Sequence, residues 1–250
     1  MVAIMDVLME PARAVDEPDE SGLVTEDGEP VDSILCEKQQ RLLTEPLYSS
    51  WAGPPPAGKG GEGGEGSEPR RFAALANVGL FSAIEEPPVV PDVMLSLDVT
   101  IPEDLEFKKN RSYFLWRYGK PPEVVIEIVS NREGDELGNR FQRYRQIRVA
   151  YYIVYDPLEQ LGGPSIRTYE LRGDLYVSVE RPWFEGVGLG LVEWDGVFEG
   201  ISRPWLRWCT REGVVVPTGA ERARSAEALA AHLAAQLRAL GIDPNGTSKG

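Results

Sequence analysis

The segment from Pro122 to Pro157 constrains the fold of this chain more than any other part. It reads PEVVIEIVSNREGDELGNRFQRYRQIRVAYYIVYDP. An apolar, β-branched run comes first, a basic pattern with helical spacing follows from about Asp135 to Ile147, and a second apolar run occupies Ala150 to Tyr155. A strand, a helix and a strand joined by a crossover of this length predict a parallel β-α-β unit.

One acidic residue, Glu127, interrupts the first apolar run, among the valines and isoleucines of positions 124–129. Burying an ionised carboxylate costs free energy unless the group is paired with a cation, hydrogen-bonded or bound to a metal. The position of Glu127 therefore predicts a buried acid with a partner.

The length and the rare residues exclude several kinds of protein. A chain of 250 residues can hold one sizeable domain with appendages, or two small domains. Cys36 and Cys209 are too few for a disulfide framework. With His232 as the single histidine, we expect neither a His and Cys zinc site nor Ser-His-Asp catalysis. The sequence has no secretory signal and no apolar run long enough to span a membrane, so we expect a cytoplasmic protein with no membrane partner.

The net charge of −14 is concentrated near the N-terminus. Residues 1–69 hold 15 acidic against four basic residues, whereas residues 70–250 hold 25 against 22. The larger part of the chain is thus nearly neutral, and its charge does not exclude a nucleic-acid partner.

Composition divides the chain into three parts. Residues 1–31 are rich in Asp, Glu and Pro, which predicts a disordered acidic leader. Residues 32–210 are the predicted domain, with a flexible Gly, Pro and Glu loop at 53–69. Its first helix is expected over Asp32 to Trp51, ended or kinked by Pro46. Residues 211–250 form the third part, a C-terminal helix and tail.

Short apolar runs predict the remaining strands. Residues 72–83 and 89–99 fit a sheet, and residues 113–118 fit a short strand. The runs on either side of Arg172 and Gly173 predict a hairpin, and two further strands are expected at Leu189 to Trp194 and Val197 to Ile201.

The C-terminal helix carries one apolar stripe, and Gly241 is expected to end it. The residues of the stripe are Ala226, Leu229, Leu233, Leu237 and Leu240. This pattern fits packing against the domain and self-association about equally well.

The candidate chemistry rests on two carboxylates and one arginine. Asp92 precedes one apolar run and Glu127 lies within another, so neighbouring strands can bring them together. Such a pair suits Mg²⁺ or Mn²⁺, and a divalent ion there would activate a water molecule and neutralise a phosphate. Arg140, on the helix that follows, could hold the phosphate.

Each of these residues also has a purely structural interpretation. Asp92 follows a proline, where aspartate is common in turns and at the starts of strands. Glu127 could be the buried partner of an arginine, and the arginines of the helix could form a solvated face.

The ordered set of these segments resembles a known family. Pro91-Asp92, the run PPEVVIEIVSN, the run ELGNRFQRYRQ and the strand AYYIVYDP resemble the Uma2 family of restriction endonuclease-like proteins, which is abundant in cyanobacteria. The resemblance covers roughly residues 72–210. It implies an α/β, PD-(D/E)XK nuclease fold, in which helices flank a central mixed β-sheet, followed here by the C-terminal amphipathic helix.

The resemblance also implies a catalytic site. It places the two metal-binding acids at Asp92 and Glu127, with Mg²⁺ or Mn²⁺ as the cofactor. The position two residues after the second acid, where nucleases of this kind usually have lysine, is Val129. Family members place a lysine on the following helix instead, and here Arg140 occupies that position.

The resemblance therefore implies a metal-dependent DNA endonuclease that hydrolyses phosphodiester bonds, with Arg140 as a phosphate ligand and its activity weakened by the missing lysine. The alternative is a non-catalytic nucleic-acid-binding or assembly protein that keeps the nuclease fold. A homodimer is compatible with both. Glu37 or Glu45, on the first helix, could add an outer carboxylate, as happens in some related nucleases.

Overall fold

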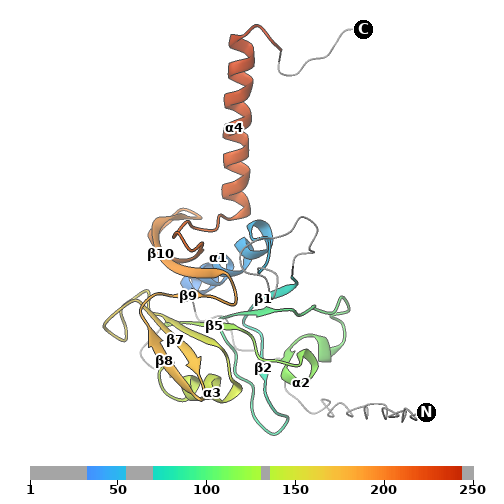
Figure 1. Ribbon diagram of the computed structural model, residues 1–250, viewed down its shortest axis with the longest axis vertical. Coiled ribbons are helices and arrows are strands. Elements are labelled where there is room, and N and C mark those ends of the chain that lie inside the picture. The colour runs from blue at the N-terminus through green and yellow to red at the C-terminus, as the bar shows by residue number, and fades with distance from the viewer. Residues whose placement is uncertain (1–32, 55–69, 131–135, 244–250) are drawn as a thin grey trace, which may run out of the picture.

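The computed structural model describes residues 33–54, 70–130 and 136–243 (Figure 1). The predicted leader over residues 1–31 lies outside the described residues, as does all of the predicted 53–69 loop except Gly53 and Pro54.

A six-stranded mixed sheet forms the centre of the protein, in the order β1-β3-β5-β6-β7-β8. Its strands are β1 (Phe72–Ala76), β3 (Val93–Leu97), β5 (Val124–Ile128), β6 (Tyr151–Tyr155), β7 (Ile166–Arg172) and β8 (Leu175–Val179). Strands β5 and β6 pair in parallel, and every other neighbouring pair in this sheet is antiparallel. The predicted parallel unit and the predicted hairpin of β7 and β8 are both confirmed.

Alternation along β5 divides the core between the two faces of the sheet. Ile126 and its even-numbered neighbours point into the core shared with α1 (Ile34–Ser50). Val125 and Val129 point into the core beneath α3 (Asn139–Ile147). Figure 1 shows these two helices on opposite sides of the sheet. Because side chains alternate along a strand, Glu127 belongs to the α3 face.

A second sheet of β11-β10-β9 extends the α1 side of the structure. It consists of β9 (Trp183–Phe184), β10 (Leu189–Phe198) and β11 (Ile201–Cys209). The strand predicted over Val197 to Ile201 is wrong, because this segment contains the hairpin turn between β10 and β11. Glu199 and Gly200 both have positive φ values there, 46° and 81°, and Gly200 adopts this conformation without steric cost.

A small parallel pair, β2 (Leu80–Phe81) and β4 (Tyr113–Phe114), lies beside the central sheet. The longer strand predicted over Tyr113 to Tyr118 is wrong after its second residue, where the chain turns into the short helix α2 (Leu115–Tyr118). Gly119 ends α2 with a φ of 72° and donates its N–H to the carbonyl of Leu115. A single 3₁₀ turn, η1 (Lys108–Asn110), precedes this unit.

Helix α1 begins where the sequence predicts, because the Ser33 hydroxyl accepts a 3.2 Å hydrogen bond from the N–H of Cys36. Of the two effects expected of Pro46, ending or kinking the helix, the first is wrong, since α1 continues to Ser50. Pro46 and the adjacent Leu47 are buried against the domain. We attribute the continuation to this packing, which offsets the hydrogen bond that proline cannot donate.

Gln39 fastens α1 to strand β11. Its side chain is fully buried, its Nε2 donates to the carbonyl of Leu206 (2.8 Å), and its Oε1 accepts from the N–H of Leu206 (3.1 Å). A side-chain amide thus satisfies two backbone groups at the edge of β11, as a neighbouring strand would.

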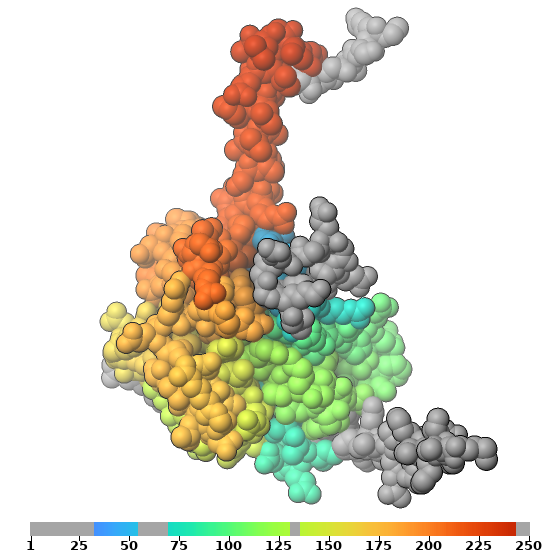
Figure 2. Space-filling view, viewed as in Figure 1, coloured from blue at the N-terminus to red at the C-terminus, as the bar shows by residue number. Residues whose placement is uncertain are grey.

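In the described part of the chain, the contacts that anchor the last helix, α4 (Gly219–Ala239), lie at its first turn. Thr218 and Glu221 form a reciprocal capping box there, and the buried Arg207 donates to both carboxylate oxygens of Glu221 (2.8 and 3.2 Å). No residue of α4 is buried, and the helix stands away from the body (Figures 1 and 2). The interpretation that its apolar stripe packs against the domain is therefore wrong.

The predicted mixed α/β class, with a central mixed sheet, flanking helices and a C-terminal helix, is confirmed by these elements. The helix ends at Ala239, and Gly241 follows with a φ of 78°, as expected for a stop signal. Within the described ranges, no helix combines the length and the apolar character that crossing a membrane requires.

We predict that Gln39→Leu lowers the free energy of unfolding by about 2–4 kcal/mol, because the N–H and the carbonyl of Leu206 both lose their buried partner. Urea denaturation followed by tryptophan fluorescence measures the change. The control is Gln146→Leu, at an exposed position of α3. Equal stability of the two variants would contradict the role assigned to Gln39.

Candidate functional site

The register between β3 and β5 brings Asp92 and Glu127 together. The two strands pair antiparallel, with Val93 opposite Ile126, so the next position outward sets Asp92 opposite Glu127. The Oδ2 atom of Asp92 accepts a 2.7 Å hydrogen bond from the N–H of Ile128. The carboxylate of Asp92 therefore continues the hydrogen-bond ladder at the point where β3 begins.

A polar side chain from α1 holds the other oxygen of Asp92. Gln40 donates from Nε2 to Asp92 Oδ1 (2.9 Å) and exchanges two 3.1 Å hydrogen bonds with the side chain of Asn77. Nothing in the sequence marks Gln40, because only the fold brings α1 to the start of β3.

The two acids expected to approach the site from α1 have other partners. Glu37 accepts from Nε of Arg41 at 2.5 Å, and Glu45 accepts from the N–H of Gly219 at 2.9 Å. The contact from α1 to the carboxylates therefore comes from an uncharged amide, and no bond from Glu37 or Glu45 reaches Asp92 or Glu127.

Two side chains from α3 contact Glu127, whose exposed fraction is 1%. The hydroxyl of Tyr144 donates to Oε1 at 2.6 Å, and Nη1 of Arg140 donates to Oε2 at 2.6 Å. Positions 140 and 144 lie one turn apart on the same face of the helix, which explains how both reach one carboxylate. The predicted partnership of Glu127 with an arginine is thus present.

Burial raises the pKa values of both Asp92 and Glu127, and the like charge of Asp92 raises that of Glu127 further. Burial, and after it the carboxylate of Asp92, raise the pKa of Glu127 to about 8, while Arg140 and the Tyr144 hydroxyl act against this rise. Burial also raises the pKa of Asp92, and the hydrogen bonds from Ile128 and Gln40 act against it. Arg140 is the cation that compensates the pair.

The other three arginines of the α3 segment point elsewhere. Arg143 pairs with Glu86 (2.5 Å), Arg145 donates to the carbonyl of Asp174 (3.0 Å), and Arg148 donates to Oδ1 of the same residue (2.8 Å). Of the four, Arg140 alone contacts the carboxylates.

A third acid, Glu136, lies near the pair at the turn before α3. It is buried, its charge raises the pKa of Glu127, and its carbonyl accepts from the Tyr152 hydroxyl (2.7 Å). The sequence interpretation did not include Glu136 in the site. The available signal was its place at the start of the ELGNR run, just ahead of Arg140.

The donor atoms at this site are compatible with a hard cation. Asp92 and Glu127 supply carboxylate oxygens, and Mg²⁺ commonly binds proteins through one or two carboxylates, with water and phosphate completing its shell. The described part of the chain holds no group of three His, Cys, Asp or Glu side chains arranged to bind a metal. A cation would also compete with Arg140 for Glu127 Oε2, and the side chain of Arg140 is 44% exposed and so has room to turn away.

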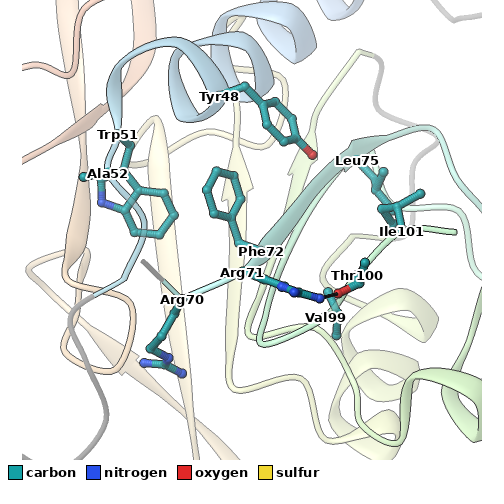
Figure 3. A pocket seen from close by; sticks show the side chains of 10 residues that line it. All are labelled: Tyr48, Trp51, Ala52, Arg70, Arg71, Phe72, Leu75, Val99, Thr100 and Ile101. Atoms are coloured by element: carbon teal, nitrogen blue, oxygen red, sulfur yellow. Dashed lines mark hydrogen bonds between the residues drawn. The ribbon is translucent and has the colours of Figure 1, made fainter. Parts of the chain in front are cut away.

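A separate hollow of about 620 Å³ lies at the other end of β1 (Figure 3). The ring of Phe72 lies between those of Tyr48 (5.2 Å) and Trp51 (4.9 Å), and Arg71 lines the same hollow. Since Phe72 pairs with Leu97 and Ala76 with Val93, the strand separates this hollow from the end of the sheet that holds Asp92.

Comparison with known proteins supports the family resemblance. Residues 65–186 match the model of the Uma2 family, described as "Putative restriction endonuclease". The resemblance to Uma2 is thereby confirmed over this range, which contains Asp92, Glu127 and Arg140 and leaves α1, β10, β11 and α4 outside it.

A solved structure, described as a putative nuclease belonging to DUF820 from Anabaena variabilis ATCC 29413, is similar to part of the chain. The match has 15% sequence identity and a TM-score of 0.30, and it covers 44% of this chain and 56% of the other, little more than half its length. No curated protein matches the chain. The fold class therefore rests on the sheet topology described above.

We predict that Glu127 makes the protein less stable as the pH rises. A carboxyl group whose pKa is raised in the folded state binds its proton more tightly there than in the unfolded chain, so its contribution is lost as pH rises through the folded pKa. In buffer with EDTA, the free energy of unfolding should fall from about pH 5 to about pH 8, between the usual pKa of a glutamate and the raised pKa of Glu127, and Glu127→Gln should flatten this slope. Equal slopes for the two proteins, measured by urea denaturation at each pH, would rule this out.

Proposed function

Since residues 65–186 match the Uma2 family, we propose that this protein is a metal-dependent endonuclease that hydrolyses phosphodiester bonds in DNA. One observation carries the proposal. Within the matched range, neighbouring strands bring the carboxylates of Asp92 and Glu127 opposite one another, beside a half-exposed guanidinium. Oxygen ligands next to a cationic hydrogen-bond donor suit a metal ion and a phosphate.

In this proposal Asp92 and Glu127 hold Mg²⁺ or Mn²⁺. When bound, such an ion lowers the pKa of a water molecule and neutralises charge on the phosphate. The hydrogen bonds from Ile128 and Gln40 fix the orientation of Asp92, and the hydrogen bond from Tyr144 fixes that of Glu127. Prearranged ligands lower the cost of assembling the site.

Arg140 has two roles in succession. It pairs with Glu127 in the free protein, and beside a bound cation its guanidinium would donate to a phosphate oxygen of DNA. Arginine stays protonated in proteins, so Arg140 stabilises negative charge and does not accept a proton.

No lysine takes part in this arrangement. Val129, at the position where nucleases of this kind usually have lysine, is fully buried and apolar. The raised pKa of Glu127, about 8, belongs to the metal-free protein, and a bound cation would keep this carboxylate ionised.

We predict that Asp92→Asn and Glu127→Gln each lower the rate of plasmid cleavage in Mg²⁺ or Mn²⁺ by at least about 100-fold, because each removes a charged ligand. The control is Asp174→Asn, since the side chain of Asp174 is 89% exposed in the turn between β7 and β8. Cleavage that survives in both site variants would reject this site.

We predict that Arg140→Lys raises cleavage by about tenfold, because lysine offers a proton donor and orients a water molecule where arginine is fixed in charge. Arg145→Lys on the same helix controls for the general effect of the exchange. An unchanged or lower rate for Arg140→Lys, with an unchanged melting temperature, would show that arginine is not what limits the reaction.

The second candidate is a DNA-binding protein without nuclease activity. The observation in its favour is the ion pair between Arg140 and Glu127, in which the protein supplies the cation itself. Calorimetric titration with Mg²⁺ separates the candidates: the endonuclease binds the ion and Asp92→Asn abolishes binding, whereas the second candidate stays folded and binds none. For both, DNA affinity should fall as salt rises, because phosphate contacts release counterions.

A further inference from the structure

Helix α4 presents an apolar stripe to solvent along its whole length. It has 21 residues, which corresponds to about 31 Å and about six turns. Figures 1 and 2 show it projecting from the body as a single column. Leu229, Leu233 and Leu240 are 58%, 49% and 75% exposed. These leucines form an exposed apolar helix face, and no other described element packs against it.

We propose that α4 pairs antiparallel with α4 of a second copy of this chain. The proposal does not depend on the endonuclease function, because it rests on α4 and on the surface at its base. Two features choose the partner and the direction: the order of small and large residues along the stripe, and the hollow at the base of the helix.

Residue size changes along the stripe in a way that favours antiparallel pairing. Towards the base the face carries the small residues Ala223 and Ala226 beside Arg222, and towards the tip it carries Leu233, Leu237 and Leu240. With the two-fold axis near Leu233, the partner's Leu240 lies over Ala226, so large residues meet small ones. In parallel pairing each residue would meet its own copy, which crowds the tip and leaves a gap at the base.

The surface at the base of α4 has room for the tip of a partner helix. A hollow of about 490 Å³ adjoins the small residues of the stripe. It is lined by Pro217, Gly219, Arg222, Ala223, Ser225 and Ala226. In the antiparallel arrangement the partner's Leu240 and Ile242 reach this hollow, and in the single chain these two residues are 75% and 52% exposed.

Sedimentation of the full chain tests the association. We expect a dimer at about 10 μM, and we expect Leu233→Lys to weaken it at least about 100-fold, since it sets two charges together at the centre of the stripe. Ala235→Lys adds the same charge on the exposed opposite face and should leave the dimer intact. A monomeric full chain, or equal behaviour of the two lysine variants, overturns the proposal.

Cysteine cross-linking tests the direction. A mixture of Ala226→Cys and Leu240→Cys chains should form a mixed disulfide, because these positions face each other only when the helices run antiparallel. Leu240→Cys chains alone should not cross-link to one another. Self-linked Leu240→Cys, or a dimeric sample without the mixed disulfide, overturns the antiparallel arrangement.

Discussion

The burial of the Glu127 carboxylate is the constraint on which the arrangement around it depends. A charge on the inner face of a central strand must be compensated from the element packed on that face, and α3 does so with Arg140 and Tyr144. The same carboxylate interacts with Asp92 across the β3–β5 pairing, so the register of these two strands and the position of α3 are tied to one buried group. Removing Arg140 leaves the buried carboxylates of Glu127 and Asp92 without their cation.

Helix α1 links the stability of the fold to the geometry of the carboxylates through two consecutive residues. Gln39 satisfies the backbone of β11 on one side of the helix, and Gln40 orients Asp92 from the next position along the chain. The two amides lie about 100° apart around the helix, so one turn of α1 contacts both β11 and the start of β3. A shift of α1 along its axis would therefore disturb β11 and Asp92 together.

Much of this arrangement could be predicted from the sequence because it depends on local pattern. The apolar runs, the crossover and the buried acid identify β5, α3 and β6, and with them the partnership of Glu127 with an arginine. Gln40 and Asn77 could not be predicted, because uncharged amides are common in every context and only tertiary structure brings these two to Asp92. The turn at Glu199 was missed because the run from Val197 to Ile201 is apolar enough to be interpreted as a strand. The sequence leaves open whether Pro46 ends or kinks α1, because propensity is a local quantity and the packing that carries the helix to Ser50 is not.

The ion pair between Arg140 and Glu127 affects whether folding of the protein requires a bound metal. Where a buried carboxylate depends on a metal for its charge balance, folding has to wait for the metal. Here the chain carries its own counterion, so it can fold completely at any metal concentration. A divalent cation of the kind proposed above would have to displace this guanidinium, and its apparent affinity would be reduced by the free energy of that exchange. The occupancy of the carboxylates would then depend on competition between two cations, one of which is part of the chain.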